Sequence, residues 1–305
     1  MTKSVFVAGH SGLVGSAILS SLRADGDFEV IVAGRSELDL RDGRAVSNFL
    51  AKTKPSGVII AAGTVGGIRA NSQRPAEFLW DNTMIAANLV EAARAAGVDR
   101  LMYLSSNCIF PKSFDPPHHV SMVGKGPMEE TNEWYGYAKI VGMKLCESYR
   151  QQYGCDFFSV IPTSCFGPGD RTTIGDAHVI PDVIMKCLEK SNEIDADMQV
   201  TLWGTGSPIR EYLFASDLGA AIVFLFKNYR GIGPVNIGGG TKVSIRALAT
   251  KIAEIIDPNL RIVFDEGFPD GAPARFLENS TLEEMGWSSS TPFDVALRQT
   301  IDWYR

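Results

Sequence analysis

A short apolar segment followed by three regularly spaced glycines constrains the fold of this chain more than any other feature. Residues 4–8 (SVFVA) are apolar and run into Gly9, and Gly12 and Gly15 follow at intervals of three. From residue 16 onward the apolar residues take up helical spacing. The pattern predicts a buried strand, a glycine-rich turn and a helix. Glycines there let the backbone approach a pyrophosphate, whose charge the helix N-terminus stabilises, although a plain tight turn has the same signature.

The same alternation of strand and helix continues through the first half of the chain. Apolar strand-like runs recur at residues 29–33, 57–63, 101–104 and 156–161, with helical stretches between them. This order predicts an α/β fold with a Rossmann-type, doubly wound parallel sheet over residues 1–164. Beyond Pro162 the pattern changes, and residues 165–305 are expected to form a smaller, discontinuous α/β substrate domain. Segments at about 214–256 are expected to return to the first domain.

The glycine-rich turn and the ends of the next two strands predict a set of cofactor contacts. The second strand ends in Gly34-Arg35, without the acid that binds the ribose 2′-hydroxyl of NAD. A cation there accommodates a 2′-phosphate, so the sequence favours NADP over NAD, unless Arg35 is a solvated loop residue. Asp39 is placed to reach the adenine, and small residues let a dinucleotide lie over the third strand. The expected contacts are Gly9, Ser11, Gly12, Leu13, Val14, Gly15, Arg35, Asp39 and Ala62.

A tyrosine and a lysine four residues apart supply the predicted chemistry. Tyr135 and Lys139 lie on one face of a predicted helix, and a neighbouring ammonium favours the phenolate form of a tyrosine. The pair can therefore donate or accept a proton near neutral pH. Ser106 follows the strand at 101–104, at the edge where parallel sheets bind ligands, and can meet a substrate oxygen. Cys108 can face the same space, although a buried structural cysteine is the alternative.

Composition excludes several classes of partner. The net charge is −6 and lysines and arginines are scattered, which argues against nucleic acid or an anionic membrane as partner. The longest apolar run, near residues 218–226, is too short to span a bilayer. Five cysteines without a CxxC pair or an export signal indicate reduced thiols in the cytoplasm. We expect no metal, and we expect His118 and His119, in a long loop, to be solvated.

The motifs at Gly9, Gly12, Gly15, Ser106, Tyr135 and Lys139 resemble those of the extended short-chain dehydrogenase/reductases. Longer segments resemble the GDP-L-fucose synthase family over essentially the whole chain: GHSGLVGSAI, TVGGIRAN, SSNCIFPK, TNEWYGYAKIVGMKLCESY, HVIP and GTGSPIREYLF. The resemblance implies NADPH-dependent 3,5-epimerisation and 4-reduction of GDP-4-keto-6-deoxy-D-mannose. It also implies a homodimer, formed through the helices around Asn88 and Tyr149.

The resemblance assigns roles to individual residues. Ser106, Tyr135 and Lys139 match a reductive triad, in which Tyr135 protonates the C4 oxygen and Lys139 also holds the nicotinamide ribose. Cys108 and His178 match an acid/base pair for epimerisation, although His178 by itself reads as a helix cap or a surface histidine. Pro162 and His178 are further cofactor contacts. The residues expected around the GDP-sugar are Lys186, Trp203, Arg210 and Arg275.

The chain departs from the family pattern at three places. Ser11 stands where relatives often carry arginine, which predicts a modest preference for NADPH. Ser164 replaces a common asparagine, and a GPxDN motif becomes Gly167-Pro-Gly-Asp170-Arg171. The alternatives are an enzyme like GDP-colitose synthase, or another reductase of 4-keto nucleotide sugars. A non-catalytic NADP sensor is the alternative from a different class, since it would need the glycine-rich turn but not the triad.

Overall fold

A six-stranded parallel sheet forms the centre of the larger part of the protein. The computed structural model describes residues 3–170, 177–193, 197–268 and 270–305. The strand order is β2-β1-β3-β4-β5-β9, and every neighbouring pair is parallel. The doubly wound Rossmann-type fold expected from the sequence is confirmed. The strands are β1 (Lys3–Ala8), β2 (Phe28–Ile31), β3 (Gly57–Ile60), β4 (Arg100–Leu104), β5 (Asp156–Pro162) and β9 (Val235–Ile237).

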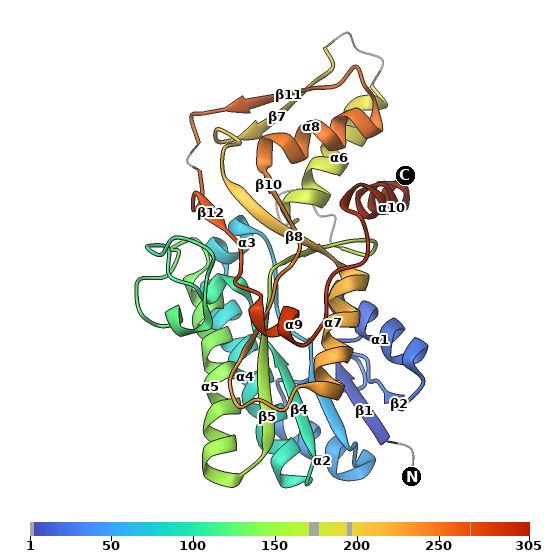
Figure 1. Ribbon diagram of the computed structural model, residues 1–305, viewed down its shortest axis with the longest axis vertical. Helices are drawn as coiled ribbons and strands as arrows, with labels where there is room; N and C mark the ends of the chain where they lie inside the picture. The colour runs from blue at the N-terminus through green and yellow to red at the C-terminus, as the bar shows by residue number, and fades with distance from the viewer. Residues whose placement is uncertain (1–2, 171–176, 194–196, 269) are drawn as a thin grey trace.

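Helices cover both faces of this sheet, as Figure 1 shows in its lower half. One face packs against α1 (Leu13–Asp25) and α7 (Ala215–Asn228), and the other against α2 (Gly43–Thr53), α4 (Pro75–Ala95) and α5 (Glu133–Tyr153). Successive residues of β1 enter different cores: Val5 and Val7 face one, and Phe6 and Ala8 the other. Burial on both faces explains why the strands read as continuous apolar runs in the sequence.

A smaller unit sits above the carboxyl ends of the large sheet (Figure 1). Its mixed sheet joins β6 (Ser164–Phe166), β8 (Ile209–Phe214), β10 (Thr241–Ser244) and β12 (Ala274–Arg275). A separate parallel pair joins β7 (Gln199–Trp203) and β11 (Arg261–Asp265). Its core is completed by α6 (Val179–Ser191), α8 (Ile245–Ile256) and α10 (Phe293–Tyr304). The remaining short helices are α3 (Ile68–Gln73), η1 (Asn107–Ile109), η2 (Val120–Met122) and α9 (Ser280–Glu284).

The chain returns to the large sheet over a shorter stretch than the expected 214–256. The helix α7 and the strand β9 join the Rossmann core, and Leu282 of α9 also packs there. In contrast, β10 pairs with β8, and the apolar face of α8 (Leu248, Ala249, Ile252) enters the core of the smaller unit. An amphipathic pattern shows that a helix buries one face, but it does not say which of two cores receives that face.

The expectation that His118 is solvated is wrong. His118 is 2% exposed, and its ring stacks on Phe110. Its Nδ1 lies 3.1 Å from the carbonyl oxygen of Phe276 and its Nε2 lies 3.2 Å from that of Phe114. The loop that connects η1 to α5 is thereby attached to the segment that follows β12. His119 is exposed, as expected, and its side chain caps η2.

The structure also bears on two expectations, one about the cysteines and one about membrane-spanning helices. All five cysteines are free thiols. Among the described residues, no helix combines the length and the apolar character needed to cross a bilayer.

Candidate active site

The glycine-rich turn packs so closely on the tip of β3 that side chains would not fit at two of its glycines. Gly9 has φ +87°, and a Cβ there would lie 2.6 Å from the Cα of Ala62. A Cβ on Gly15 would lie 1.9 Å from the carbonyl oxygen of Gly9. A Cβ on Gly12 would meet only that oxygen, at 3.6 Å, so the outer side of the turn is open. Because Gly12 is the N-cap of α1, no capping side chain covers the first amides of the helix, and the first turn of α1 holds no acid. These features fit a bound pyrophosphate.

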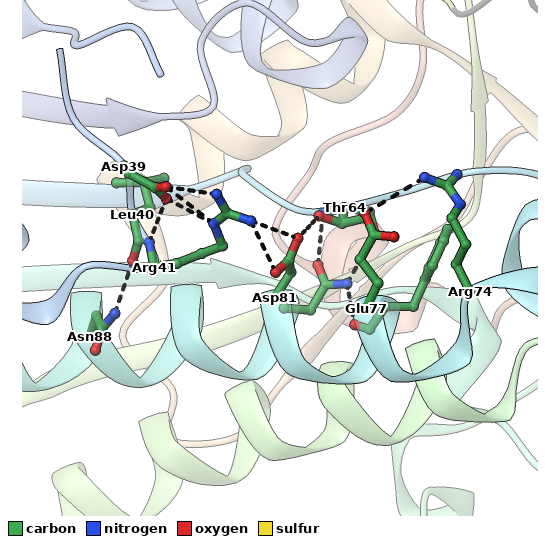
Figure 2. Close-up of polar contacts among 10 residues, drawn as sticks. Asp39, Leu40, Arg41, Thr64, Arg74, Glu77, Asp81 and Asn88 are labelled. Carbon is green, nitrogen blue, oxygen red and sulfur yellow. Dashed lines mark hydrogen bonds and ion pairs between the residues drawn. The ribbon is translucent and has the colours of Figure 1, made fainter. Parts of the chain in front are cut away.

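An ionic network holds the two loops beside this turn against α4 (Figure 2). The guanidinium of Arg41 contacts the carboxylate of Asp39 at 2.7 Å and that of Asp81 at 3.3 Å. The hydroxyl of Thr64, just beyond β3, donates to Asp81 at 3.0 Å. Hydrogen bonds from Arg41 lower the pKa of Asp39 to about 2, so this candidate adenine contact is a carboxylate. Sequence reasoning missed Arg41 and Asp81, because nothing local links residues 40 positions apart.

Arg35 lies in an exposed turn four residues beyond the end of β2, which closes at Ile31 rather than at residue 33. Its charge still contributes to the lowered pKa of Asp39. The cation expected at the 2′-position therefore stands on the same side of the site as the candidate adenine contact.

The side chains of Ser106, Tyr135 and Lys139 meet at the carboxyl end of β4. Ser106 caps η1 by accepting from the amide of Cys108, and its hydroxyl is close enough to the phenol of Tyr135 to act on the pKa of that tyrosine. The ammonium of Lys139 donates to the carbonyl oxygen of Leu104 at 3.0 Å and lies 5.6 Å from the centroid of the Tyr135 ring. The structure therefore brings together the three residues that the sequence singled out for proton transfer.

Burial sets the protonation of this group. It raises the pKa of Tyr135 above the ordinary value, and the charge of Cys108 adds to the effect, while the Ser106 hydrogen bond opposes it. We expected Lys139 to favour the phenolate form of Tyr135. In the structure the desolvation of the phenol has the larger effect and favours the neutral form. Burial also lowers the pKa of Lys139 to about 8. Tyr135 thus keeps its proton at neutral pH, which is the form that can donate one.

Cys108 lies in the same space, partly buried at the start of η1. The side-chain amide of Asn132 donates to its sulfur at 3.5 Å. Asn132 precedes α5 as its cap residue, yet its side chain makes no capping bond and turns to the sulfur instead. Asn132 therefore helps to hold the sulfur in place, and it is a functional candidate that sequence reasoning missed.

His178 enters from the smaller unit, as the residue that precedes α6. Its side chain is 49% exposed, and its Nδ1 lies 3.2 Å from both carboxylate oxygens of Asp170, whose side chain is 5% exposed. The sequence named Asp170 only as part of a departing motif. Arg171, the other residue of that departure, lies outside the described residues. Pro162 closes β5, and Ser164 accepts a hydrogen bond from Asn107 at 3.4 Å.

Two of the four expected substrate contacts stand side by side. Arg210 on β8 and Arg275 on β12 occupy paired positions in parallel strands, and neither forms an ion pair within the described part of the chain. Burial and the charge of Arg275 lower the pKa of Arg210, whereas the charge of Cys108 acts in the opposite sense. Arg210 therefore lies within electrostatic reach of the candidate base. Two adjacent unpaired cations make a site for an anion.

The other two expected substrate contacts are engaged within the protein. Lys186 on α6 pairs with Asp182, one turn earlier, at 2.7 Å. Trp203 ends β7, is 69% exposed and stacks on Phe268 at 4.2 Å between ring centroids. Among the described residues, no group of three or more histidines, cysteines and acids is arranged to hold a metal ion.

The buried ammonium of Lys139 generates a prediction about stability. Replacing Lys139 with Met should raise the free energy of unfolding at pH 7 by about 1–3 kcal/mol. Below pH 8 the lysine is protonated in both states, so the folded state bears the full desolvation penalty. Between pH 8 and about 10.4 the folded state loses its proton first and the penalty fades. Urea unfolding at pH 7 and pH 10 measures this, and the gain should shrink at pH 10.

Lys144→Met is the matched control, because Lys144 lies on the same helix, 60% exposed and paired with Glu147. It should change stability little at either pH. If Lys139→Met destabilises the protein at pH 7, the hydrogen bond to Leu104 outweighs desolvation.

Comparison with known proteins identifies the family of the chain. The model of the NAD dependent epimerase/dehydratase family matches residues 5–238. A GDP-L-fucose synthase of Sinorhizobium fredii is 42% identical over 301 residues, covering 98% of this chain and 95% of the relative. A GDP-L-colitose synthase of Yersinia pseudotuberculosis is 32% identical over 302 residues, covering 98% and 97%.

A solved structure also matches the whole fold. The GDP-L-fucose synthetase of Naegleria fowleri, bound to NADP, superposes with a TM-score of 0.89 at 26% identity, covering 99% of this chain and 94% of that one. The chain belongs to the NAD dependent epimerase/dehydratase family and, within it, to the branch of the GDP-L-fucose synthases.

Proposed function

We propose that the protein converts GDP-4-keto-6-deoxy-D-mannose to GDP-L-fucose by 3,5-epimerisation and NADPH-dependent 4-reduction. The observation that carries the proposal is the meeting of a protonated Tyr135 with Ser106, Lys139 and Cys108 at one strand end. The similarity to a GDP-L-fucose synthase over 98% of the chain supports the choice of substrate. The protein would be both an oxidoreductase and an epimerase. It would work in the cytoplasm.

The residues around β4 are suited to reduction. NADPH, held by the glycine-rich turn, Asp39, Ala62 and Pro162, would supply the hydride to C4. Tyr135 would give its proton to the C4 oxygen, with Ser106 orienting the phenol. The ammonium of Lys139, with a pKa of about 8, would offset the negative charge that Tyr135 acquires. Arg35 would meet the 2′-phosphate, although Ser11 offers no second cation there.

Epimerisation needs no hydride, but it needs two proton carriers. Hydrogens at C3 and C5 are acidic because the resulting carbanion delocalises onto the C4 oxygen. Inversion requires that one group removes a proton from one face and another returns a proton to the opposite face. Cys108 comes from the Rossmann unit and His178 from the smaller unit, which suits them to two faces of one sugar. Arg210 and Arg275 would bind the diphosphate, with Lys186 and Trp203 around the rest of the GDP-sugar.

The two half-reactions should separate by mutation. Tyr135→Phe should lower the rate of reduction by ~10²–10⁴-fold, since a positioned proton donor is lost. The same variant should still exchange the C3 and C5 hydrogens of the substrate for deuterium in heavy water. Cys108→Ser and His178→Gln should do the reverse, with little exchange and any hydride transfer giving unepimerised sugar. NMR of substrate and product measures both.

Other outcomes point to the alternatives. If the rate of deuterium exchange is unchanged in both Cys108→Ser and His178→Gln, the epimerase assignment is wrong and the protein is a simple 4-reductase. If the wild type binds NADPH tightly but turns over no 4-keto nucleotide sugar, a sensor is the better description. A product other than GDP-L-fucose would favour another reductase of 4-keto nucleotide sugars, such as an enzyme like the colitose synthase, to which the identity is lower.

The two cation sites should respond to different ligands. Arg35→Ala should raise the KM for NADPH by about 5- to 30-fold and that for NADH less, because only NADPH carries the 2′-phosphate. Arg210→Ala should raise the KM for the nucleotide sugar and leave NADPH affinity unchanged. Steady-state kinetics with both cofactors tests the pair. Equal losses for NADPH and NADH would remove Arg35 from the phosphate site.

A homodimer formed through α4 and α5 is part of the proposal. These helices pack side by side and carry exposed large side chains: Trp80, Trp134, Tyr137, Val141 and Tyr153. Such a surface is typical of an interface. Light scattering should give the mass of a dimer, and Val141→Glu should shift it toward the monomer. Trp303→Glu, at an exposed aromatic on α10, is the control that should leave the mass unchanged. A monomeric wild type would contradict the proposal.

A further inference from the structure

We propose that Asp170 is a positioning residue for His178, which fixes the hydrogen of the imidazole on Nδ1 and so makes Nε2 the atom that exchanges a proton with the sugar. The inference rests on the epimerisation proposed above. The inference adds Asp170, from the loop after β6, to the residues that serve epimerisation. It depends on how that side chain lies against His178 at the start of α6.

The geometry of the pair carries the inference. The carboxylate of Asp170 is buried, with 5% of the side chain exposed, whereas the imidazole is 49% exposed. Both carboxylate oxygens lie 3.2 Å from Nδ1. An acid therefore stands behind the ring on its inner side, and the ring extends toward solvent. Histidines that carry protons in enzymes are commonly oriented by an inner carboxylate in this way.

The contact decides the tautomer. A carboxylate has no hydrogen to donate, so Nδ1 must carry the hydrogen of this bond. The lone pair of the neutral ring is then on Nε2. When the imidazolium gives its Nε2 proton to the sugar carbon, the electron pair of the enolate forms the new C–H bond and the N–H pair stays on Nε2. The other hydrogen stays on Nδ1 throughout and is donated to the carboxylate of Asp170, which stabilises the positive ring before the transfer.

The loop holds Asp170 independently of this contact. Gly169, with φ +89°, allows the turn that precedes it, and the hydroxyl of Tyr304 on α10 donates to the backbone carbonyl of Asp170 at 3.0 Å. The charge of Asp170 also raises the pKa of Cys165 and of Tyr304, behind burial as the larger cause. Those two neighbours therefore stay neutral near pH 7.

A purely structural role is the competing interpretation. His178 is the cap residue of α6, and an acid near a helix N-terminus is stabilising whatever its neighbour does. Substitution of Asp170 would then loosen the loop or the helix end without selecting a tautomer. The two interpretations differ in what happens to the hydrogen on the ring, which can be observed directly.

The test is Asp170→Asn, examined by nitrogen NMR of labelled histidines and by substrate exchange. The chain has 4 histidines, and the signals of His178 are identified by their loss in His178→Gln. The wild type should show hydrogen on Nδ1. In Asp170→Asn the amide can donate to Nδ1, so the population should move to the Nε2–H tautomer. Deuterium exchange at C3 and C5 should fall by about 10- to 10⁴-fold, with NADPH binding unchanged.

Tyr304→Phe is the matched control, because it releases the backbone of Asp170 without altering the carboxylate. It should keep the Nδ1–H tautomer and the exchange rate. If Asp170→Asn leaves both tautomer and exchange unchanged, the inference is overturned. It is also overturned if Asp170→Asn and Tyr304→Phe lose exchange together while the tautomer stays. A different result would contradict the proposed function itself: His178→Gln would then catalyse deuterium exchange at C3 and C5 of the substrate at the wild-type rate.

Discussion

The hydrogen bond from the buried ammonium of Lys139 to the carbonyl oxygen of Leu104 is the interaction on which the site depends. It fastens α5 to the end of β4, and the hydroxyl of Ser105 returns a bond to the carbonyl of Lys139 at 3.4 Å. With the helix fixed there, Tyr135 stands one turn earlier, beside the serine that follows Ser105. Gly142 makes the approach possible, since a Cβ would lie 2.2 Å from Cζ of Tyr103. The closeness that positions the phenol also removes it from water, and that is why its pKa rises.

The parts of this arrangement that follow from local pattern could be predicted from the sequence. The parallel sheet follows from apolar runs that alternate with helices, and the turn at Gly9 and Gly15 follows from backbone space that only glycine leaves. The meeting of Tyr135 with Ser106 follows too, because carboxyl ends of parallel strands share one edge. Each of these depends on residues near in sequence or on a general rule of α/β folds.

What could not be predicted depends on which surfaces meet across the chain. The helix α8 has the pattern of any amphipathic helix, and its place in the smaller unit is decided by neighbours from α6 and α10. His118 reads as a polar loop residue, yet one of its ring nitrogens contacts the carbonyl oxygen of Phe276, which is far away in the sequence, and the other contacts that of Phe114 in the same loop. The same holds for Asp81 with Arg41. The protonation of Tyr135 belongs here as well, since motif spacing reports the nearby lysine but not the burial that outweighs it.

The strand β8 shows how one element can join the two units and still present charge to a ligand. Successive residues of a strand point to opposite faces, so Arg210 and Glu211 face apart. Glu211, 1% exposed, accepts bonds from the backbone amides of Gly239, Gly240 and Leu277, which tie β8 to the turn after β9 and to the segment before α9. Because amide donors satisfy the hydrogen-bonding capacity of the buried carboxylate, Glu211 needs no arginine as an ion-pair partner. Arg210 and Arg275 therefore keep their charge on the opposite face, and an acidic chain retains a local cation pair beside Cys108.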